Sequence, residues 1–283
     1  MTTRTAAPDW SARFPWPAHD VHKHARGRLA VVSGRASHTG AARLAARAGL
    51  RIGAGLVRIL CPPDAVAVIA PAIEAVMLAP FSAPEGLAQA CAAMDAVVIG
   101  PAAGVGETTA ANIRALAGTG AALVIDADGL TSFEHGPQDL FGLLDRDDVL
   151  TPHEGEFERL FPGLLTRGRE IAVVEAARRA GCVVVLKGPA TVIAAPGDRL
   201  AINDNGVAWL ATAGSGDVLA GMIGGLAAQR MDSFDAARAA VWIHAAAAAD
   251  VGPGLIAEDL PEALPTVLRR LHEDAAAAPG LRL

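Results

Sequence analysis

The chain has few aromatic side chains and almost no lysine. Among its 283 residues there is no tyrosine, aromatic residues make up 4% and hydrophobic residues make up 52%. The core must therefore be built mainly from Ala, Val, Leu and Ile. Lysine occurs only at Lys23 and Lys187, although lysine and arginine together number 24. A lysine kept in an arginine-rich chain marks a place for a compact point charge, unless its presence at two positions is chance.

Clustered cysteines and long apolar runs are also missing. The three cysteines, Cys61, Cys91 and Cys182, are scattered without ligand-type spacing, as expected for a reduced, cytoplasmic protein. The first residues lack an apolar segment, so we expect no signal peptide. The sequence contains no run of about 18 uncharged apolar residues, so we predict no membrane span. The net charge of -6 argues against a nucleic-acid or anionic-membrane partner.

Short apolar runs alternate with amphipathic segments along most of the chain. The runs are continuous rather than alternating, which is typical of strands covered on both faces. This rhythm predicts an α/β fold in which a mostly parallel sheet lies between two layers of helices. The predicted strands are 28–33, 56–60, 76–79, 95–100, 122–126, 148–151 and 183–187, and the predicted helices include 108–116, 154–161 and 170–180.

The rhythm changes after Lys187. Two short runs within 191–204 are joined by Pro196-Gly197-Asp198, which predicts a small antiparallel hairpin at one edge of the sheet. Further helices are expected after Gly214, over 234–250 and in the tail. We predict an N-terminal arm over 1–25, lying on the body of the protein or on a neighbouring subunit. Residues 26–283 form a single predicted domain without a linker.

The stretch 211–229, ATAGSGDVLAGMIGGLAAQ, opens with a glycine turn and runs into a helix. Such a turn presents backbone N–H groups and the positive end of the helix dipole, which suits a phosphate or an oxyanion. Asp217 is placed in the first helical turn, where it can take a proton, although an ordinary helix cap is the alternative. Gly221, Gly224 and Gly225 each cost a helix about 1 kcal/mol relative to Ala. Another backbone or a ligand must therefore come very close.

Polar and glycine residues collect where the predicted strands end, and in an open α/β sheet ligands bind at that edge. Each residue alone is also consistent with a turn or a cap. Together the glycines and Lys187 suggest phosphate groups, the acidic residues suggest Mg²⁺, and Asp217 suggests a base for a hydroxyl that attacks phosphorus. The pattern predicts nucleotide-dependent phosphoryl transfer without specifying a substrate. The residues are Gly34, Thr39, Gly40, Gly100, Gly104, Gly106, Asp126, Asp128, His153, Glu156, Lys187, Gly188 and Thr191.

Four blocks of sequence carry a family resemblance. They are HKHARGRLAVVSGRASHTGAARLAARAGLRIGAGLV, TPHEGEFERL, VVLKGPATVI and TAGSGDVLAGMIGGLAAQ, and they extend over about residues 20–250. In this order they resemble the NAD(P)H-hydrate dehydratases of the ribokinase-like superfamily. Many bacterial members carry a fused epimerase domain, for which this chain has no room, so it resembles the stand-alone dehydratase. The resemblance implies a ribokinase-like three-layer α/β/α sandwich.

The resemblance also implies an activity. The family returns the S epimer of hydrated NADH or NADPH (NADHX or NADPHX) to NAD(P)H, with Mg²⁺ as cofactor and ADP or ATP as phosphoryl donor. With ADP, the products are AMP and phosphate. The implied site consists of the catalytic base Asp217, the substrate-binding residues Ala41, Gly104 and His153, the nucleotide-binding residues Lys187, Gly188, Pro189, Ala190, Thr191, Gly214, Ser215 and Gly216, and Glu156 beside Mg²⁺.

The sequence departs from the family pattern at a few positions. Glu154 stands where proline is usual, His38 where tyrosine is common, and Ala102 where a glycine is usual, and Val207-Ala208 replace Asn-Pro. The alternatives are a ribokinase-like kinase for a vitamin-precursor alcohol and a non-catalytic nucleotide-binding module. The family tends to form tetramers or larger assemblies. The small-residue helix faces at 41–55 and 236–249 either pack between subunits or are covered within one.

Overall fold

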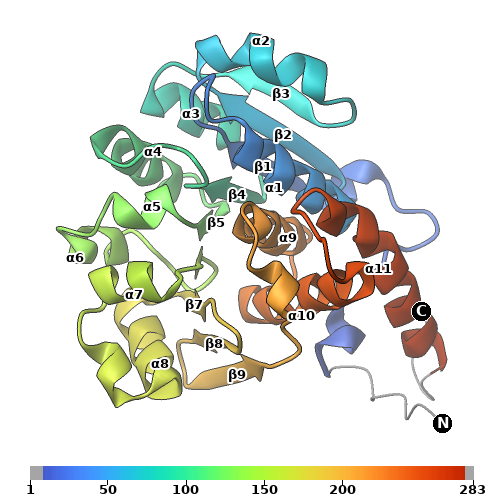
Figure 1. Ribbon diagram of the computed structural model, residues 1–283. Coiled ribbons are helices and arrows are strands. Elements are labelled where there is room, and N and C mark those ends of the chain that lie inside the picture. Colours follow the sequence, from blue (N-terminus) through green and yellow to red (C-terminus); the bar gives the residue numbers. More distant parts are fainter. Residues whose placement is uncertain (1–8, 278–283) are drawn as a thin grey trace.

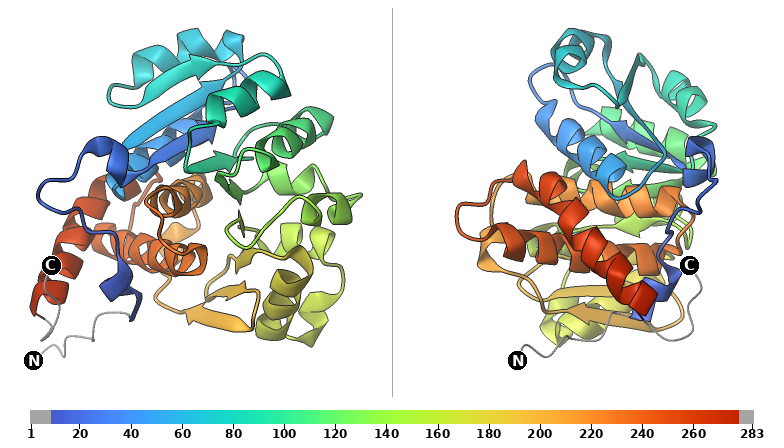
Figure 2. Two further views of the ribbon diagram at one scale, coloured as in Figure 1. Left: turned by 180° about the vertical axis from the view of Figure 1, so that it is seen from behind. Right: turned by 90° about the vertical axis from the view of Figure 1, so that its right-hand side faces the viewer.

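The computed structural model describes residues 9–277, which build one sheet with helices on both faces (Figures 1 and 2). The nine strands lie in the order β3-β2-β1-β4-β5-β6-β7-β8-β9. Pairing is parallel from β3 to β7 and antiparallel for β7–β8 and β8–β9. The predicted fold class, a mostly parallel sandwich with a small antiparallel edge, is confirmed.

The strands match the apolar runs, with ends that differ by one or two residues. The second run extends to Cys61, the third is shifted by one residue, and the sixth is reduced to two residues. These differences arise because a strand ends where its hydrogen bonds to the neighbouring strand end. The sequence of one strand alone does not show that point. The strands are β1 Arg28–Val32, β2 Leu56–Cys61, β3 Met77–Pro80, β4 Ala96–Ile99, β5 Ala122–Ile125, β6 Val149–Leu150, β7 Val183–Leu186, β8 Thr191–Ala195 and β9 Arg199–Asn203.

The helices fill the segments between the strands. Short 3-10 turns occur as well, including one at Asp9–Arg13. Among the described residues no helix combines the length and apolar character that a membrane span needs. The α-helices are α1 Gly40–Arg51, α2 Val66–Ile69, α3 Pro84–Cys91, α4 Glu107–Ala117, α5 Asp128–Thr131, α6 Pro137–Phe141, α7 Glu154–Leu160, α8 Arg169–Ala180, α9 Ser215–Ala228, α10 Ser233–Val251 and α11 Asp259–Ala277.

Successive residues of each central strand face opposite helical layers. In β1, Leu29 and Val31 join a core with α1, α9, α10 and α11, whereas Ala30 and Val32 join a second core with α3, α4, α7 and α8. Both sets of side chains are almost fully buried. This two-sided burial explains why the strands are continuously apolar. Figure 1 shows the two helical layers on either side of the sheet.

The internal glycines of α9 are explained by close packing. A Cβ atom on Gly221 would lie 2.1 Å from the carbonyl oxygen of Ala45 in α1, and one on Gly225 would lie 2.8 Å from that of Gly49. On Gly224 it would lie 2.6 Å from a methyl carbon of Val98 in the sheet. The predicted close approach of a second backbone is therefore found, and that backbone is α1. The small-residue faces of α1 and α10 are covered within one chain.

The described part of the N-terminal arm lies on the same chain. Trp10 is only 2% exposed and packs edge-on against Trp242 of α10, with ring centroids 5.9 Å apart. The Nε of Arg13 donates to a carboxylate oxygen of Asp235 at 2.7 Å. Figure 2 shows this segment in dark blue beside α10 and α11. Of the two predicted locations the described part of the arm therefore takes the body of the protein, and residues 1–8 lie outside the described residues. The division at residue 25 stays a prediction.

Candidate active site

The order in which strands are added to the sheet reverses between β1 and β4, which are parallel neighbours. After β1 the chain continues to β2 and β3 on one side, and after β3 it returns to β4 on the other. Such a switch point leaves a crevice at the carboxyl ends of the two strands. The loops that follow β1 and β4 come very close there: a Cβ atom on Gly34 would lie only 2.0 Å from the carbonyl oxygen of Ala102. Glycine at position 34 is therefore required by this contact.

Two alanines in the neighbouring loops have positive φ angles. Ala102, after β4, has φ 53°, and Ala127, after β5, has φ 47° and ψ −119°. Such conformations cost a residue with a side chain of the order of 1–3 kcal/mol, and strain of this kind clusters at functional sites. The two loops are linked by the N–H of Gly104, which donates to Asp128 Oδ2 at 2.9 Å. No heavy atom would lie within 4 Å of a Cβ on Gly104, so there is space above this glycine.

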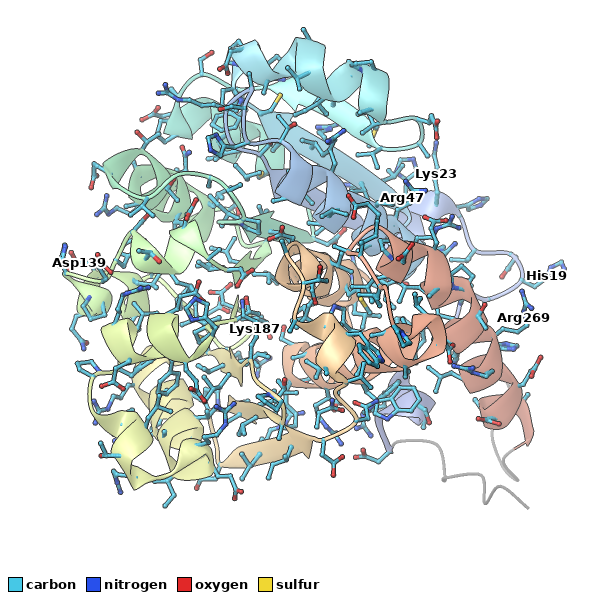
Figure 3. All side chains as sticks on the ribbon, in the orientation of Figure 1. His19, Lys23, Arg47, Asp139, Lys187 and Arg269 are labelled. Atoms are coloured by element: carbon cyan, nitrogen blue, oxygen red, sulfur yellow. The ribbon has the colours of Figure 1, made fainter. Side chains whose placement is uncertain are left out.

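Lys187 binds the carboxylate that follows β5. Its Nζ lies 2.6 Å from Asp126 Oδ1 and 3.9 Å from Glu156 Oε2. Asp126 is 2% exposed. Burial acts to lower the pKa of Lys187, but the charges of Asp126, Glu156 and Asp217 outweigh it and the pKa is raised. The lysine is therefore a fixed positive charge, and Figure 3 shows it near the centre of the view, away from the rim where His19 and Arg269 lie.

The glycine turn brings the start of α9 to this lysine. Gly214 is the N-cap residue and has the left-handed φ of 87°. A Cβ atom on Gly216 would lie 3.6 Å from Lys187 Nζ and 3.9 Å from Asp126 Oδ2. The backbone N–H groups at the start of α9 therefore lie beside the side chains at the ends of β5 and β7. Positive charge from the lysine and from the helix dipole is combined at one point.

Asp217 lies in the first turn of α9 and is half-buried. Burial raises its pKa to about 6, with a further increase from the charge of Asp126, while Lys187 acts in the opposite direction. The carboxylate is therefore largely deprotonated at neutral pH, yet it is much more basic than an ordinary aspartate. A group with this pKa is suited to accept a proton near neutral pH.

His153 and Glu156 cap the start of α7 together. Nδ1 of His153 accepts from the N–H groups of Gly155 and Glu156 at 3.0 and 3.2 Å, so the ring proton is on Nε2. In return Glu156 Oε2 accepts from the N–H of His153 at 2.8 Å, and Oε1 lies 3.3 Å from His153 Nε2. This reciprocal cap fixes the ring of His153, whose side chain is 55% exposed, at the carboxyl edge of the sheet.

Comparison with known proteins identifies the family. The family model described as NAD(P)H-hydrate dehydratase matches residues 29–266, which include every predicted site residue. The chain belongs to this family. The predicted resemblance is therefore confirmed for most of the chain, from β1 to α11.

Two curated relatives differ in length. An ADP-dependent (S)-NAD(P)H-hydrate dehydratase of Xanthomonas campestris is 35% identical over 91% of this chain and 93% of its own length. A bifunctional NAD(P)H-hydrate repair enzyme of Mycobacterium tuberculosis is 40% identical over 82% of this chain and 47% of its own length. The chain thus spans about half the length of the bifunctional relatives and nearly all of the Xanthomonas protein.

Solved structures of similar proteins have the same fold. The ADP/ATP-dependent NAD(P)H-hydrate dehydratase of Bacillus subtilis, co-crystallised with ATP and Mg²⁺, has a TM-score of 0.79 at 27% identity. The alignment covers 94% of this chain and 99% of that one. A ribokinase-like protein of Enterococcus faecalis has a TM-score of 0.82 at 23% identity, which shows the fold alone. The ribokinase-like sandwich is confirmed.

Within this dehydratase fold, the predicted site residues gather along one edge of the sheet. Lys187, Glu156 and the start of α9 converge, as the strand-end argument predicts. Ala41 lies in the first turn of α1, one turn before Leu44, whose Cδ1 would lie 2.8 Å from a Cβ on Gly214. The roles of the predicted nucleotide- and substrate-binding residues stay predictions, since the structure gives their positions only.

The carboxylates fit a magnesium ion only in part. Both oxygens of Glu156 already contact His153, and Asp126 pairs with Lys187. Over residues 9–277, no group of three or more His, Cys, Asp or Glu side chains is placed to hold a metal. Mg²⁺ commonly keeps several waters and binds through one or two carboxylates plus substrate phosphates. The residues present therefore fit an ion that arrives with nucleotide phosphates, rather than a cage built by the protein.

Sequence reasoning does not single out His244 and Arg169, and leaves Asp126 without a specific role. His244, in α10, is buried and its Nε2 lies 3.0 Å from the carbonyl oxygen of Ser215. Arg169 contacts the loop after β7. A polar residue directly after an apolar strand is the signal for Asp126. The other two lie in helices, at positions where the local sequence carries no signal of a contact with a distant loop.

Proposed function

We propose that this chain catalyses ADP-dependent dehydration of the S epimer of hydrated NAD(P)H, giving NAD(P)H, AMP and phosphate. The observation that carries the proposal is Asp217, a carboxylate with a pKa of about 6 in the first turn of α9. It lies beside a fixed lysine charge and a glycine turn. The Xanthomonas relative is named for the same reaction and is of similar length, which supports the choice of substrate and donor.

Asp217 acts as the base in the first step. It takes the proton of the ring hydroxyl while that oxygen attacks the β-phosphorus of ADP. The bond from this phosphorus to the bridging oxygen breaks, and AMP leaves with the electron pair. The N–H groups of Gly214, Ser215 and Gly216, with the charge of Lys187, stabilise the negative charge on the transferring group.

Elimination completes the reaction. Phosphate leaves the ring carbon with the electrons of the C–O bond, assisted by the lone pair of the ring nitrogen. Loss of a ring proton then restores the dihydronicotinamide. Phosphate is a far better leaving group than hydroxide, so the transfer to the hydroxyl oxygen is what makes the dehydration fast.

The remaining predicted residues are assigned to the two ligands. Lys187, Gly188, Pro189, Ala190 and Thr191 form the nucleotide loop. Ala41, Gly104 and His153 bind the hydrated cofactor, at the crevice beside β1 and β4 and at the end of β6, which β5 separates from β4. Glu156 is the residue that would hold Mg²⁺, and the ion would neutralise phosphate charge when it binds with the nucleotide. We further propose a cytoplasmic homotetramer, in line with the resemblance.

A recovery assay tests the proposed function. The protein is incubated with NADPHX and either ADP or ATP, and the absorbance of the dihydronicotinamide is followed. The expected result is recovery of absorbance with release of AMP when ADP is present. No recovery with either donor, combined with phosphorylation of a hydroxymethylpyrimidine or thiazole alcohol, would establish the kinase alternative instead. Nucleotide binding without any turnover would establish a binding module.

A further inference from the structure

One arginine joins two loops at the carboxyl edge of the sheet. Arg169 is the first residue of α8, and its guanidinium forms an ion pair with Glu154, the first residue of α7. Nη2 of the same guanidinium lies 3.1 Å from the carbonyl oxygen of Ala190 and 3.4 Å from those of Leu186 and Lys187. A single side chain thus contacts the helix that His153 caps and both ends of the nucleotide loop.

The carbonyl groups that face Arg169 determine where the N–H groups of the loop point. In a trans peptide the C=O and the following N–H point in opposite directions, and the described chain has no cis peptide. The N–H of Lys187 accordingly faces away from Arg169 and donates to the carbonyl oxygen of Pro152 at 2.9 Å. The N–H of Gly188 faces away from Arg169 for the same reason. An anion cradle requires N–H groups rather than carbonyl oxygens on its open side.

Gly188 lies directly against the guanidinium. A Cβ atom at this position would lie 2.6 Å from Nη2 of Arg169, so the close approach of loop and arginine depends on glycine. The side chain of Arg169 is 29% exposed and that of Glu154 is 62% exposed. An ion pair this exposed adds little to the stability of the fold. The ion pair instead orients the guanidinium, because Nη1 binds Glu154 while Nη2 binds the carbonyl oxygen of Ala190.

We propose that Arg169, oriented by Glu154, is a positioning residue that presents the N–H of Gly188, in the 187–191 loop, to a nucleoside diphosphate. Since Glu154 adjoins His153, the same pair couples the substrate-side segment to the nucleotide loop. This inference rests on the proposed function in placing the nucleotide at this loop. Arg169 touches neither ligand, and it acts by holding three carbonyl oxygens on the closed side of the loop.

The test uses the full chain and three variants, R169K, E154Q and the double variant. Lysine keeps the positive charge but lacks the fork that reaches two partners. The control is R178Q, on the same helix, where the arginine pairs with Glu175 at 2.8 Å on the surface. ADP dissociation constants are measured by calorimetry without substrate. The KM for ADP, the KM for NADPHX and kcat are then measured in the recovery assay.

R169K is expected to weaken ADP binding about tenfold, the equivalent of one charge-assisted hydrogen bond, with kcat within about twofold of wild type. E154Q is expected to weaken it about two- to threefold, and to have almost no further effect in the R169K background, because it acts through the arginine. R178Q should match wild type in every measurement. A purely structural role for Arg169 predicts lower stability with unchanged ADP affinity.

The outcomes separate this inference from the proposed function. An ADP dissociation constant in R169K equal to that of wild type overturns the inference, whether or not the wild type dehydrates NADPHX. Weakened ADP binding in R169K without dehydration by the wild type supports the inference and overturns the proposed function. If the wild type does not bind ADP, both are wrong. Should R169K fail to fold, the exposed variant E154Q decides, because unchanged ADP affinity there overturns the coupling.

Discussion

The imidazole Nε2 of His244 lies 3.0 Å from the backbone carbonyl oxygen of Ser215, the first residue of α9. A carbonyl oxygen only accepts, so Nε2 carries the proton and donates it. His244 is 6% exposed, and burial lowers its pKa to about 4. A neutral histidine from α10 thus holds the first turn of α9, two residues before the proposed base Asp217.

His244 makes the fold sensitive to acid. Its pKa is about 4 in the folded chain, below the ordinary value of 6.5, so the unfolded chain binds the proton more readily. The free energy of unfolding therefore falls as the pH decreases from 6.5 toward 4, by on the order of 3 kcal/mol at the lower end. Urea unfolding at pH 7.5 and at pH 5 measures the loss.

The variant H244Q isolates this contribution. Glutamine can donate to the same carbonyl oxygen and does not titrate, so H244Q should lose less stability than wild type between the two pH values. The comparison is needed because burial raises the pKa of Asp148 to about 7, which has the opposite effect on stability as the pH falls. An equal loss in both proteins would mean that His244 is not the acid-sensitive group.

The proposed base Asp217 should determine the acid limb of the pH–rate profile. With a pKa of about 6 it must be deprotonated to act as base, so kcat/KM should fall about tenfold per pH unit below that value. D217N should lower kcat by on the order of 10³ while ADP binding is retained, since the N–H groups of the turn are unchanged. D139N, a change on the exposed surface in α6, should alter neither quantity. Undiminished turnover by D217N would remove Asp217 as the base.

Gly221 carries the contact between α1 and α9. G221A places a Cβ 2.1 Å from a backbone oxygen of Ala45, so the helices must separate, at a cost of about 3 kcal/mol. G86A is the matched control, because Gly86 lies inside α3 with no neighbour within 4 Å, and alanine there should add about 1 kcal/mol. Urea midpoints of both variants measure the difference. Equal stability would contradict the packing explanation.

The sequence predicts the sheet and its active edge because both arise from local patterns. Strands buried on two faces require continuous apolar runs, and the polar residue that follows each run must lie at the carboxyl edge. For this reason Asp126, Glu156 and Lys187 are found together. The glycines of α9 indicate a close neighbour for a similar reason, since glycine in a helix is costly without one.

What the sequence does not predict depends on contacts between distant segments. Arg169 and Ala190 are neighbours only because α8 returns beside β7, and His244 reaches Ser215 only because α10 packs on α9. The capping role of Glu156 is local and its signal is present, an acidic residue three positions after His153. Histidine is uncommon as a helix cap. For this reason the spacing of His153 and Glu156 points to a functional site more readily than to the start of a helix.

The variant A102G tests whether glycine relieves the backbone strain in the loop after β4. The φ of 53° at Ala102 is reached without strain by glycine. A102G should therefore raise the free energy of unfolding by about 0.5 kcal/mol, the relief of strain less the added freedom of the unfolded chain. A103G is the control, because Ala103 is not one of the residues with a positive φ in the described part of the chain. Its free energy of unfolding should fall by up to about 1 kcal/mol. The same loop packs against Gly34, where a Cβ atom would lie 2.0 Å from the carbonyl oxygen of Ala102. A loss of stability in A102G as large as that in A103G would show that this contact, rather than the φ angle of Ala102, determines the conformation of the loop.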